Sequence, residues 1–323
     1  MLLSDFIRTS VKTLSSLYEA EEARSMVMYY CSEVLGFPVY QHITEPKTEI
    51  PEELAGRVQA DMERLAASEP LQYVLGYTEF CGRNFAVDAR ALIPRAETEM
   101  LCIKAGEMVA GTSEPEDASA PLRILDLCTG SGCIAWTLAL DLPGAEVIAT
   151  DLSSEALDLA RSQFGKRGAV PGWTGRLPKH VAAPHFVQAD VLDVEVTLAA
   201  ATGRFKQTDS HFAGFDLLTA NPPYVMPREK EEMRPNVLDW EPHMAIFAPD
   251  LDPLAFHKAI ALIARRALVP GGHGIVEINS ELPEETAEVF RRAGLFEVQI
   301  VPDFFDRPRF VAFSLAASSR AGE

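Results

Sequence analysis

The first 70 residues carry apolar side chains at steps of three and four, the spacing that gathers them on one face of an α-helix. The series Leu3, Ile7, Val11, Leu14 and Tyr18 marks the first helix. A second helix is expected over 22–35, before glycine and proline stop signals, and a third from Pro51, because proline is favoured in a first turn. Short helices are only marginally stable alone, so we expect a small helical bundle at 1–70.

The pattern changes at residue 71. Short apolar runs are now separated by glycine and asparagine, which is typical of a β-hairpin. We therefore expect a β-hairpin connector at 71–95, with strand residues from Tyr73 and Leu75 onwards. A helix should follow over 96–110, where acidic residues fall favourably in its first turn.

Strands and helices alternate from residue 122 onwards. Strands are expected at 122–127, 147–150, 185–189, 215–220 and 274–278, helices at 134–140, 153–164, 253–268 and 283–293, and a closing hairpin at 296–301 and 310–315. The stretches 111–121, 165–184 and 225–252 are expected to be loops, and 191–214 shows no clear pattern. This βαβ alternation is the signature of a doubly wound parallel sheet, so we predict an α/β domain at 96–323.

Composition narrows the class of protein. The chain has 323 residues, 47% of them hydrophobic and 24% charged, as in an ordinary globular protein. No apolar run approaches the ~20 residues that span a membrane, and the start lacks the features of a signal peptide, so we expect a cytoplasmic protein without membrane contact. The net charge of −18, with no basic stripe, argues against nucleic acid as the main substrate.

The cysteines give no sign of a disulfide framework or a metal site. They are Cys31, Cys81, Cys102, Cys128 and Cys133, an odd number scattered through apolar segments. That distribution favours reduced thiols in a reducing compartment. No histidine or further cysteine lies near the last two at zinc-site spacing, so we expect buried structural thiols and no bound metal.

Two polar motifs follow the first predicted strands of the α/β domain. The first spans 126–132, where Gly130 and Gly132 allow a tight turn and close approach of a ligand. It is similar to the dinucleotide-binding fingerprint, so a nicotinamide enzyme is open at this point. Asp151 ends the next strand and can accept both hydroxyls of a ribose. The alternative is that Asp151 caps the next helix, although Ser153 could do so equally well.

Two more motifs follow later strands. Asp190 can accept from an adenine amino group, with Val191 against the ring; the alternative is a plain strand-end acid. Residues 221–224 read Asn-Pro-Pro-Tyr, and the two prolines stop the strand because neither donates a ladder hydrogen bond. Asn221 is thus held at the carboxyl end of a strand, where ligands bind in open α/β sheets. All four motifs should line one crevice.

Together these segments resemble a known family. "LDLCTGSGCIA" at 125–135, Asp151, "QAD" at 188–190 and "NPPY" at 221–224 are similar to class I S-adenosylmethionine-dependent methyltransferases. They resemble more specifically the HemK/PrmC family, which methylates the glutamine of the Gly-Gly-Gln motif in peptide-chain release factors. The segments 70–101 and 241–260 are similar to that family's connector and to its sequence after the catalytic turn.

The resemblance implies a Rossmann-like fold, S-adenosyl-L-methionine as methyl donor, S-adenosyl-L-homocysteine as product and class I release factors as protein substrate. It implies a cofactor site at Asp126, Cys128, Thr129, Gly130, Ser131, Gly132, Asp151, Leu152, Asp190, Val191 and Asn221. The implied catalytic residues are Asn221, Pro222 and Tyr224, which with Pro223 bind the substrate amide. The Asn221 side-chain oxygen and the Pro222 carbonyl would accept its two N–H groups, and Tyr224 would pack on its flat face. The helical bundle would dock the release factor.

The sequence also departs from the family pattern. Ala96 stands where the family usually has proline, and residues 277–280 lack its usual glycine and glutamine. Arg95, Glu97 and Glu99 either border the active site or lie on a helix surface. His257 either touches the protein substrate or lies on a solvated helix surface, and we expect the solvated surface. The nearest alternative function is an adenine-specific DNA or RNA methyltransferase using the same Asn-Pro-Pro-Tyr motif, against which the charge and the matching connector argue.

Overall fold

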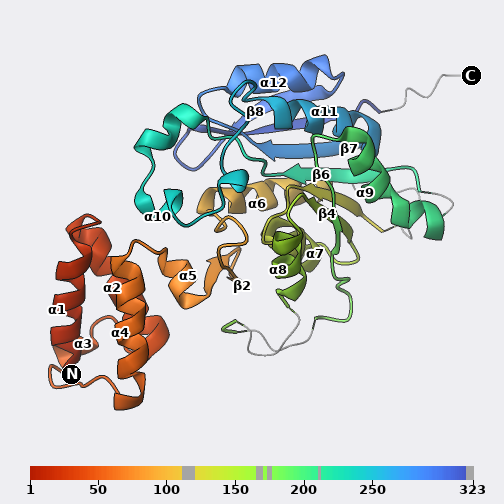
Figure 1. Cartoon of the computed structure of the whole chain (residues 1–323). Coiled ribbons are helices and arrows are strands. Elements are labelled where there is room, and N and C mark those ends of the chain that lie inside the picture. Colours follow the sequence, from red (N-terminus) through yellow and green to blue (C-terminus); the bar gives the residue numbers. More distant parts are fainter. Residues whose placement is uncertain (111–120, 165–169, 173–176, 210–211, 318–323) are drawn as a thin grey trace, which may run out of the picture. The chain divides into compact units, whose positions relative to one another are not determined.

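The computed structural model describes residues 1–110, 121–164, 170–172, 177–209 and 212–317. Residues 111–120 of the predicted loop at 111–121, and residues 165–169 and 173–176 of the one at 165–184, lie outside these residues. The chain divides into two compact units (Figure 1). The first comprises Met1–Thr78, Val87–Ala89 and Met233–Glu241, and the second comprises Glu79–Ala86, Arg90–Glu232 and Pro242–Glu323.

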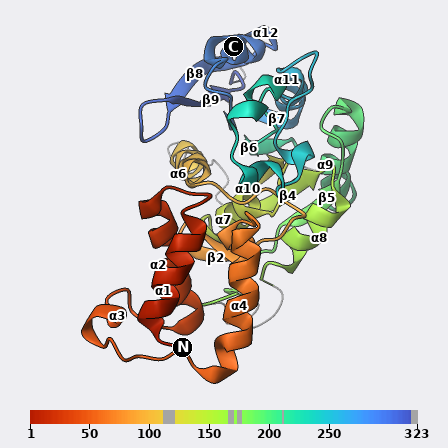
Figure 2. The same ribbon diagram turned by 60° about the vertical axis from the view of Figure 1, so that its left-hand side comes forward.

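The first unit is a helical bundle. Its helices are α1 (Leu3–Leu14), α2 (Ala20–Leu35), α3 (Gln41–Thr44), α4 (Glu52–Ala66) and α5 (Leu71–Leu75). Helix α1 packs against α2 and α4 around a core that includes Leu3, Leu14 and Val27 (Figure 2). Within this core the Tyr30 hydroxyl donates to the Asp61 carboxylate at 2.8 Å. The three predicted helices are therefore confirmed, and the short α3 was not predicted.

The β-hairpin begins later than predicted. Residues 71–75 form helix α5, so the expectation of strand at Tyr73 and Leu75 is wrong. The apolar residues of this segment have helical spacing, and Gly76 ends the helix in a left-handed conformation at φ 81°. The hairpin itself consists of β1 (Tyr77–Phe80) and β2 (Arg83–Ala86).

The second unit is built on a seven-stranded sheet in the order β5-β4-β3-β6-β7-β9-β8. The strands are β3 (Arg123–Leu127), β4 (Glu146–Asp151), β5 (His185–Gln188), β6 (Phe215–Ala220), β7 (Leu268–Glu277), β8 (Phe296–Pro302) and β9 (Pro308–Ser314). Strands β3 to β7 are parallel, while β9 is antiparallel to both β7 and β8. The predicted doubly wound sheet and its closing hairpin are confirmed, and the strand order reverses between β3 and β6.

Helices cover both faces of this sheet (Figure 1). Helices α6 (Ala96–Ala110), α7 (Cys133–Asp141) and α8 (Ser154–Ser162) pack on one face, and α9 (Val194–Thr208), α11 (Ala255–Ala267) and α12 (Pro283–Arg292) on the other. The predicted loop at 225–252 contains the short helical turns η1 (Pro227–Glu232), α10 (Pro235–Leu238) and η2 (His243–Ala245). Helix α9 was not predicted, because its buried face mixes two large apolar residues, Leu198 and Phe205, with Thr197, Ala201 and Thr202, so the apolar series is interrupted.

Candidate active site

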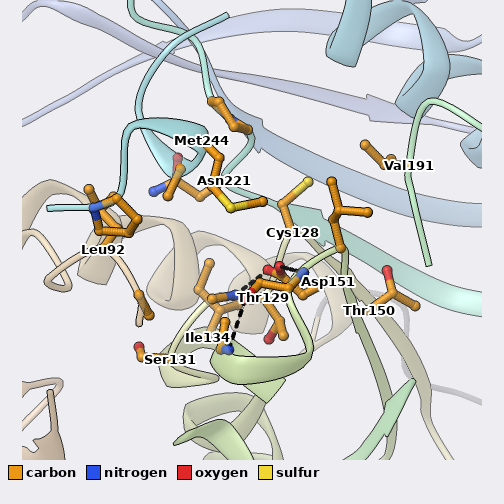
Figure 3. Close-up of a pocket in the computed structure, with 18 of the residues that line it drawn as sticks. Leu92, Cys128, Thr129, Ser131, Ile134, Thr150, Asp151, Val191, Asn221 and Met244 are labelled. Carbon is orange, nitrogen blue, oxygen red and sulfur yellow. Dashed lines mark hydrogen bonds between the residues drawn. The ribbon is translucent and has the colours of Figure 1, made fainter. Parts of the chain in front are cut away.

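A cavity of about 300 Å³ opens at the carboxyl ends of the central parallel strands. The predicted site residues that line it are Cys128, Thr129, Gly130, Ser131, Asp151, Leu152, Asp190, Val191, Asn221 and Pro223. Figure 3 shows Cys128, Asp151 and Asn221 reaching this cavity from three different strands. Four predicted residues, Asp126, Gly132, Pro222 and Tyr224, do not line it.

The register of the sheet explains why these residues meet. Leu127, the last residue of β3, pairs with Thr150 of β4 on one side and with Ala220 of β6 on the other. The residues that follow these three positions therefore emerge side by side at one edge of the sheet. This is the point where the strand order reverses, and such switch points are where open α/β sheets bind ligands.

The glycine turn after β3 has an unusual backbone. Cys128 and Gly130 both have positive φ, at 57° and 53°. A side chain added at Gly130 would meet no atom within 4 Å, whereas one at Gly132 would come within 2.9 Å of the Ala160 Cβ. Gly130 therefore leaves space beside the cavity, and Gly132 is required for packing at the start of α7.

Asp126 supports this turn from beneath. It is fully buried and accepts hydrogen bonds from the hydroxyls of Thr129 at 2.6 Å and Thr219 at 2.8 Å. Burial raises the pKa of Asp126 to about 7, although the two hydroxyl donors favour its ionised form. Its carboxylate ties the turn to β6.

Asp151 presents its carboxylate at the end of β4. One oxygen accepts from the Gly130 N–H at 2.8 Å and the other from the Ser153 N–H at 2.9 Å (Figure 3). The helix cap of α8 is Ser153, whose side chain accepts from the Ala156 N–H at 3.1 Å. Burial raises the pKa of Asp151, and the backbone N–H groups oppose that shift. The carboxylate therefore belongs to the cavity wall, held in place by the turn.

Beyond Asp151 the cavity wall is formed by two apolar side chains, Leu152 and Val191, and one carboxylate, Asp190. Leu152 is 49% exposed and Val191 is buried, and both line the cavity. Asp190 accepts from the Leu192 N–H at 2.9 Å, which fixes one of its carboxylate oxygens. A flat ring could therefore contact Leu152 while a donor on its edge met Asp190.

The Asn-Pro-Pro-Tyr turn follows β6 and is tied to two residues that sequence reasoning missed. The Asn221 amide donates to the Thr98 hydroxyl at 3.2 Å, and that hydroxyl donates to Glu277 at 2.8 Å. The Tyr224 hydroxyl donates to the other Glu277 oxygen at 2.7 Å. Burial and the neighbouring Glu277 raise the pKa of Tyr224 well above its usual range, so the phenol keeps its proton.

The structure corrects the expectation for His257 and places Asn279, Arg95 and Glu99. His257 is 1% exposed rather than solvated, and its Nε2–H donates to the Glu277 carbonyl at 3.0 Å. Burial lowers the pKa of His257 to about 4. In the segment that departs from the family pattern, the Asn279 amide donates to the Tyr224 carbonyl at 3.1 Å. Arg95 lines the cavity, whereas Glu99 accepts from the Cys81 N–H at 3.1 Å.

The described part of the chain also contains all five cysteines, which are free thiols. Cys133 is buried as expected, whereas Cys128 is only partly buried, because it follows strand β3 and lines the cavity. No group of three or more histidine, cysteine or acidic residues is placed there to hold a metal ion. Among the described helices none is long and apolar enough to cross a membrane.

The fold and the site define a class. The sheet is parallel except for its last hairpin, in which the antiparallel strand β9 lies between β7 and β8. The cavity is bordered by a glycine turn, a strand-end aspartate and the Asn-Pro-Pro-Tyr turn. Both features are those of a class I methyltransferase. Residues 8–76 match the family model described as "PrmC N-terminal domain".

Curated relatives identify the family. A release factor glutamine methyltransferase from Bacteroides thetaiotaomicron is 35% identical over 96% of this chain and 98% of its own length. Proteins of the same name from Flavobacterium psychrophilum and Cereibacter sphaeroides are 30% and 32% identical, over 96% and 98% of this chain and 98% and 100% of their own lengths. The chain therefore belongs to the release factor glutamine methyltransferase family.

A solved structure is also similar. The release-factor-specific protein-(glutamine-N5) methyltransferase from Alicyclobacillus acidocaldarius aligns with 72% of this chain and 99% of its own, at 22% identity and a TM-score of 0.40. A likeness at this score does not bear on the assignment, which follows from the full-length relatives.

Proposed function

We propose that this protein transfers a methyl group from S-adenosyl-L-methionine to the side-chain amide nitrogen of the glutamine in the Gly-Gly-Gln motif of class I release factors, and so modulates translation termination. Family membership supports the substrate. The observation that carries the chemistry is Asn221, an amide held at a strand end beside the cavity. We further propose that the helical segment 1–70 docks the release factor.

The cavity residues fit the cofactor. A volume of about 300 Å³ lies at the lower end of the range for small-molecule sites. Each Asp151 oxygen accepts one backbone N–H, and a carboxylate has about four acceptor positions, so capacity is left for ribose hydroxyls. Asp190 would accept from the adenine amino group, and Leu152 and Val191 would contact its ring. When bound, the cofactor supplies a methyl group activated on a sulfonium sulfur.

The task of this chain's own residues is to orient the acceptor. An amide nitrogen is a poor nucleophile, because its lone pair is delocalised into the carbonyl. The Asn221 oxygen and the Pro222 carbonyl would accept the two N–H groups of the glutamine and hold its nitrogen toward the cavity. Positioning of this kind can account for ~7–11 kcal/mol of a barrier. In the transfer the glutamine nitrogen would gain the methyl group, S-adenosyl-L-homocysteine would be the leaving group, and one amide proton would pass to solvent.

The variant Asn221→Ala tests this role. It removes the proposed acceptor for the substrate N–H but leaves Asp151 and the glycine turn in place. We expect methyl transfer to a release factor to be abolished, with the affinity for S-adenosyl-L-homocysteine, measured by calorimetry, largely intact. Near-normal turnover by purified Asn221→Ala protein would contradict the proposal.

A further inference from the structure

A chain of buried hydrogen bonds lies behind Asn221. It runs from the Asn221 Nδ2 to the Thr98 Oγ1 at 3.2 Å, and from there to the Glu277 Oε2 at 2.8 Å. The Tyr224 Oη donates to Glu277 Oε1 at 2.7 Å and completes it. Thr98 and Glu277 are only 2% and 1% exposed, so their hydrogen bonds are made to one another rather than to solvent.

The hydrogen atoms available in this chain fix the direction of every bond. An ionised carboxylate only accepts, and a threonine or tyrosine hydroxyl has a single hydrogen to donate. Thr98 and Tyr224 both give that hydrogen to Glu277. Thr98 can therefore only accept on its other side, and the group of Asn221 that faces it must be the NH2.

The orientation of Asn221 follows from this direction. With Nδ2 turned to Thr98, the oxygen Oδ1 occupies the other branch of the amide. No residue in the described part of the chain donates to that oxygen. Asn221 lines the cavity, so Oδ1 is the acceptor that it offers to a bound molecule. A flipped amide would instead present two donors, which cannot bind an N–H group.

We propose that Thr98 and Glu277 are positioning residues, which lock the Asn221 amide with its oxygen toward the substrate N–H. This inference rests on the proposed function, because it assigns the locked oxygen to the glutamine amide. Neither residue needs to touch the reacting atoms; both act through Asn221.

The groups around Glu277 determine whether its carboxylate is ionised, and the hydrogen-bond directions depend on that ionisation. Burial raises the pKa of Glu277, as does Glu97, whereas the Thr98 and Tyr224 hydroxyls and the Arg309 guanidinium lower it. Arg309 is itself held by Asp303, with both contacts at 3.2 Å. Ionised Glu277 is the form that requires both hydroxyls to donate, and the nearby Arg309 favours that form.

The first test compares two substitutions of Thr98. Thr98→Val keeps the shape of the side chain but removes its hydroxyl, whereas Thr98→Ser keeps the hydroxyl. Losing one such hydrogen bond corresponds to about a tenfold effect. We expect Thr98→Val to lower kcat for release factor methylation at least tenfold, with the Kd for S-adenosyl-L-homocysteine within twofold of the wild type, and Thr98→Ser to restore kcat.

The matched control is Thr202→Val. Thr202 is also buried, and its hydroxyl donates to the Leu198 carbonyl within helix α9, away from the cavity. Thermal melts of both valine variants would show any general loss of stability. A lock on Asn221 predicts that only Thr98→Val loses turnover, even where both variants melt at lower temperature.

Glu277→Gln is the second test. The new amide group can donate to the Thr98 hydroxyl. That hydroxyl then keeps its own hydrogen and can donate it to Asn221, which permits the flipped amide. We expect kcat to fall at least tenfold with cofactor affinity unchanged. The inference would be overturned if Thr98→Val and Glu277→Gln kept the wild-type kcat, or if Thr98→Ser lost as much kcat as Thr98→Val. Either result would leave the proposed function standing. A wild-type enzyme that methylates no release factor would overturn the proposed function, and this inference with it.

Discussion

The replacement of Asp151 by alanine is the most direct test of how the cavity binds its cofactor. Two ribose hydroxyls donating to an ionised carboxylate contribute about 1.5–3 kcal/mol each. Their loss corresponds to about 3–6 kcal/mol, or a Kd weakened by roughly 10²–10⁴-fold. Asp151→Asn keeps one acceptor oxygen, so its affinity should lie between that of the wild type and that of Asp151→Ala.

Asp151→Ala also lowers the stability of the fold, and this loss must be separated from the loss of cofactor affinity. Alanine leaves the N–H groups of Gly130 and Ser153 without their acceptor, a cost of about 1–3 kcal/mol each at most. Helix α8 keeps Ser153 as its cap, so the protein should fold. Asp193→Ala is the matched control, since Asp193 caps α9 by accepting from Val196 at 3.1 Å and does not line the cavity.

Calorimetry with S-adenosyl-L-homocysteine, alongside thermal melts, distinguishes the two effects. We expect Asp151→Ala to weaken binding by at least a hundredfold and Asp193→Ala to lower only the melting temperature. A Kd for folded Asp151→Ala within about threefold of the wild type would refute the ribose assignment, since even one lost hydrogen bond of ~1.5 kcal/mol exceeds that ratio.

Two further predictions concern stability. The pKa of His257 is lowered to about 4 in the folded protein and is near 6.5 in the unfolded chain. At a pH between these two values, His257 takes up a proton only when the protein unfolds. The stability that neutral His257 contributes is therefore lost as pH falls, by about 2 kcal/mol from pH 7 to pH 5. Urea titrations at both pH values should show a smaller loss of unfolding free energy in His257→Leu than in the wild type. Equal losses in the two proteins would contradict the burial argument. Gly132→Ala places its Cβ 2.9 Å from Ala160, so it should destabilise by about 1–3 kcal/mol more than Gly130→Ala, where no atom lies within 4 Å. Equal urea midpoints for the two glycine variants would show that packing at Gly132 is unimportant.

Much of the site could be predicted because it sits at strand ends. Each parallel strand is a short apolar run, and the polar residue that ends it marks the same edge of the sheet. Asp151, Asp190 and Asn221 were therefore expected together, and the structure places all three on one cavity. Their assigned roles toward cofactor and substrate, like the domain boundaries at residues 70 and 95, stay predictions.

The supporting residues could not be predicted in the same way. Thr98 and Glu277 lie 179 residues apart in the sequence, and only the packing of α6 against β7 brings their side chains together. No local pattern encodes that contact. His257 was misjudged for a similar reason, since the position of a helix residue relative to solvent depends on the sheet that it covers. In α9 threonine and alanine share the buried face with Leu198 and Phe205, so the helix has no strong apolar period.

The most direct test of the proposed function is to follow a labelled methyl group. The purified protein would be incubated with labelled S-adenosyl-L-methionine and a class I release factor, and separately with duplex DNA. We predict label on the glutamine of the Gly-Gly-Gln motif, none on a release factor whose glutamine is replaced by glutamate, and none on DNA. Labelled DNA beside an unlabelled release factor would show instead that the Asn-Pro-Pro-Tyr turn serves a nucleobase, and would contradict the account.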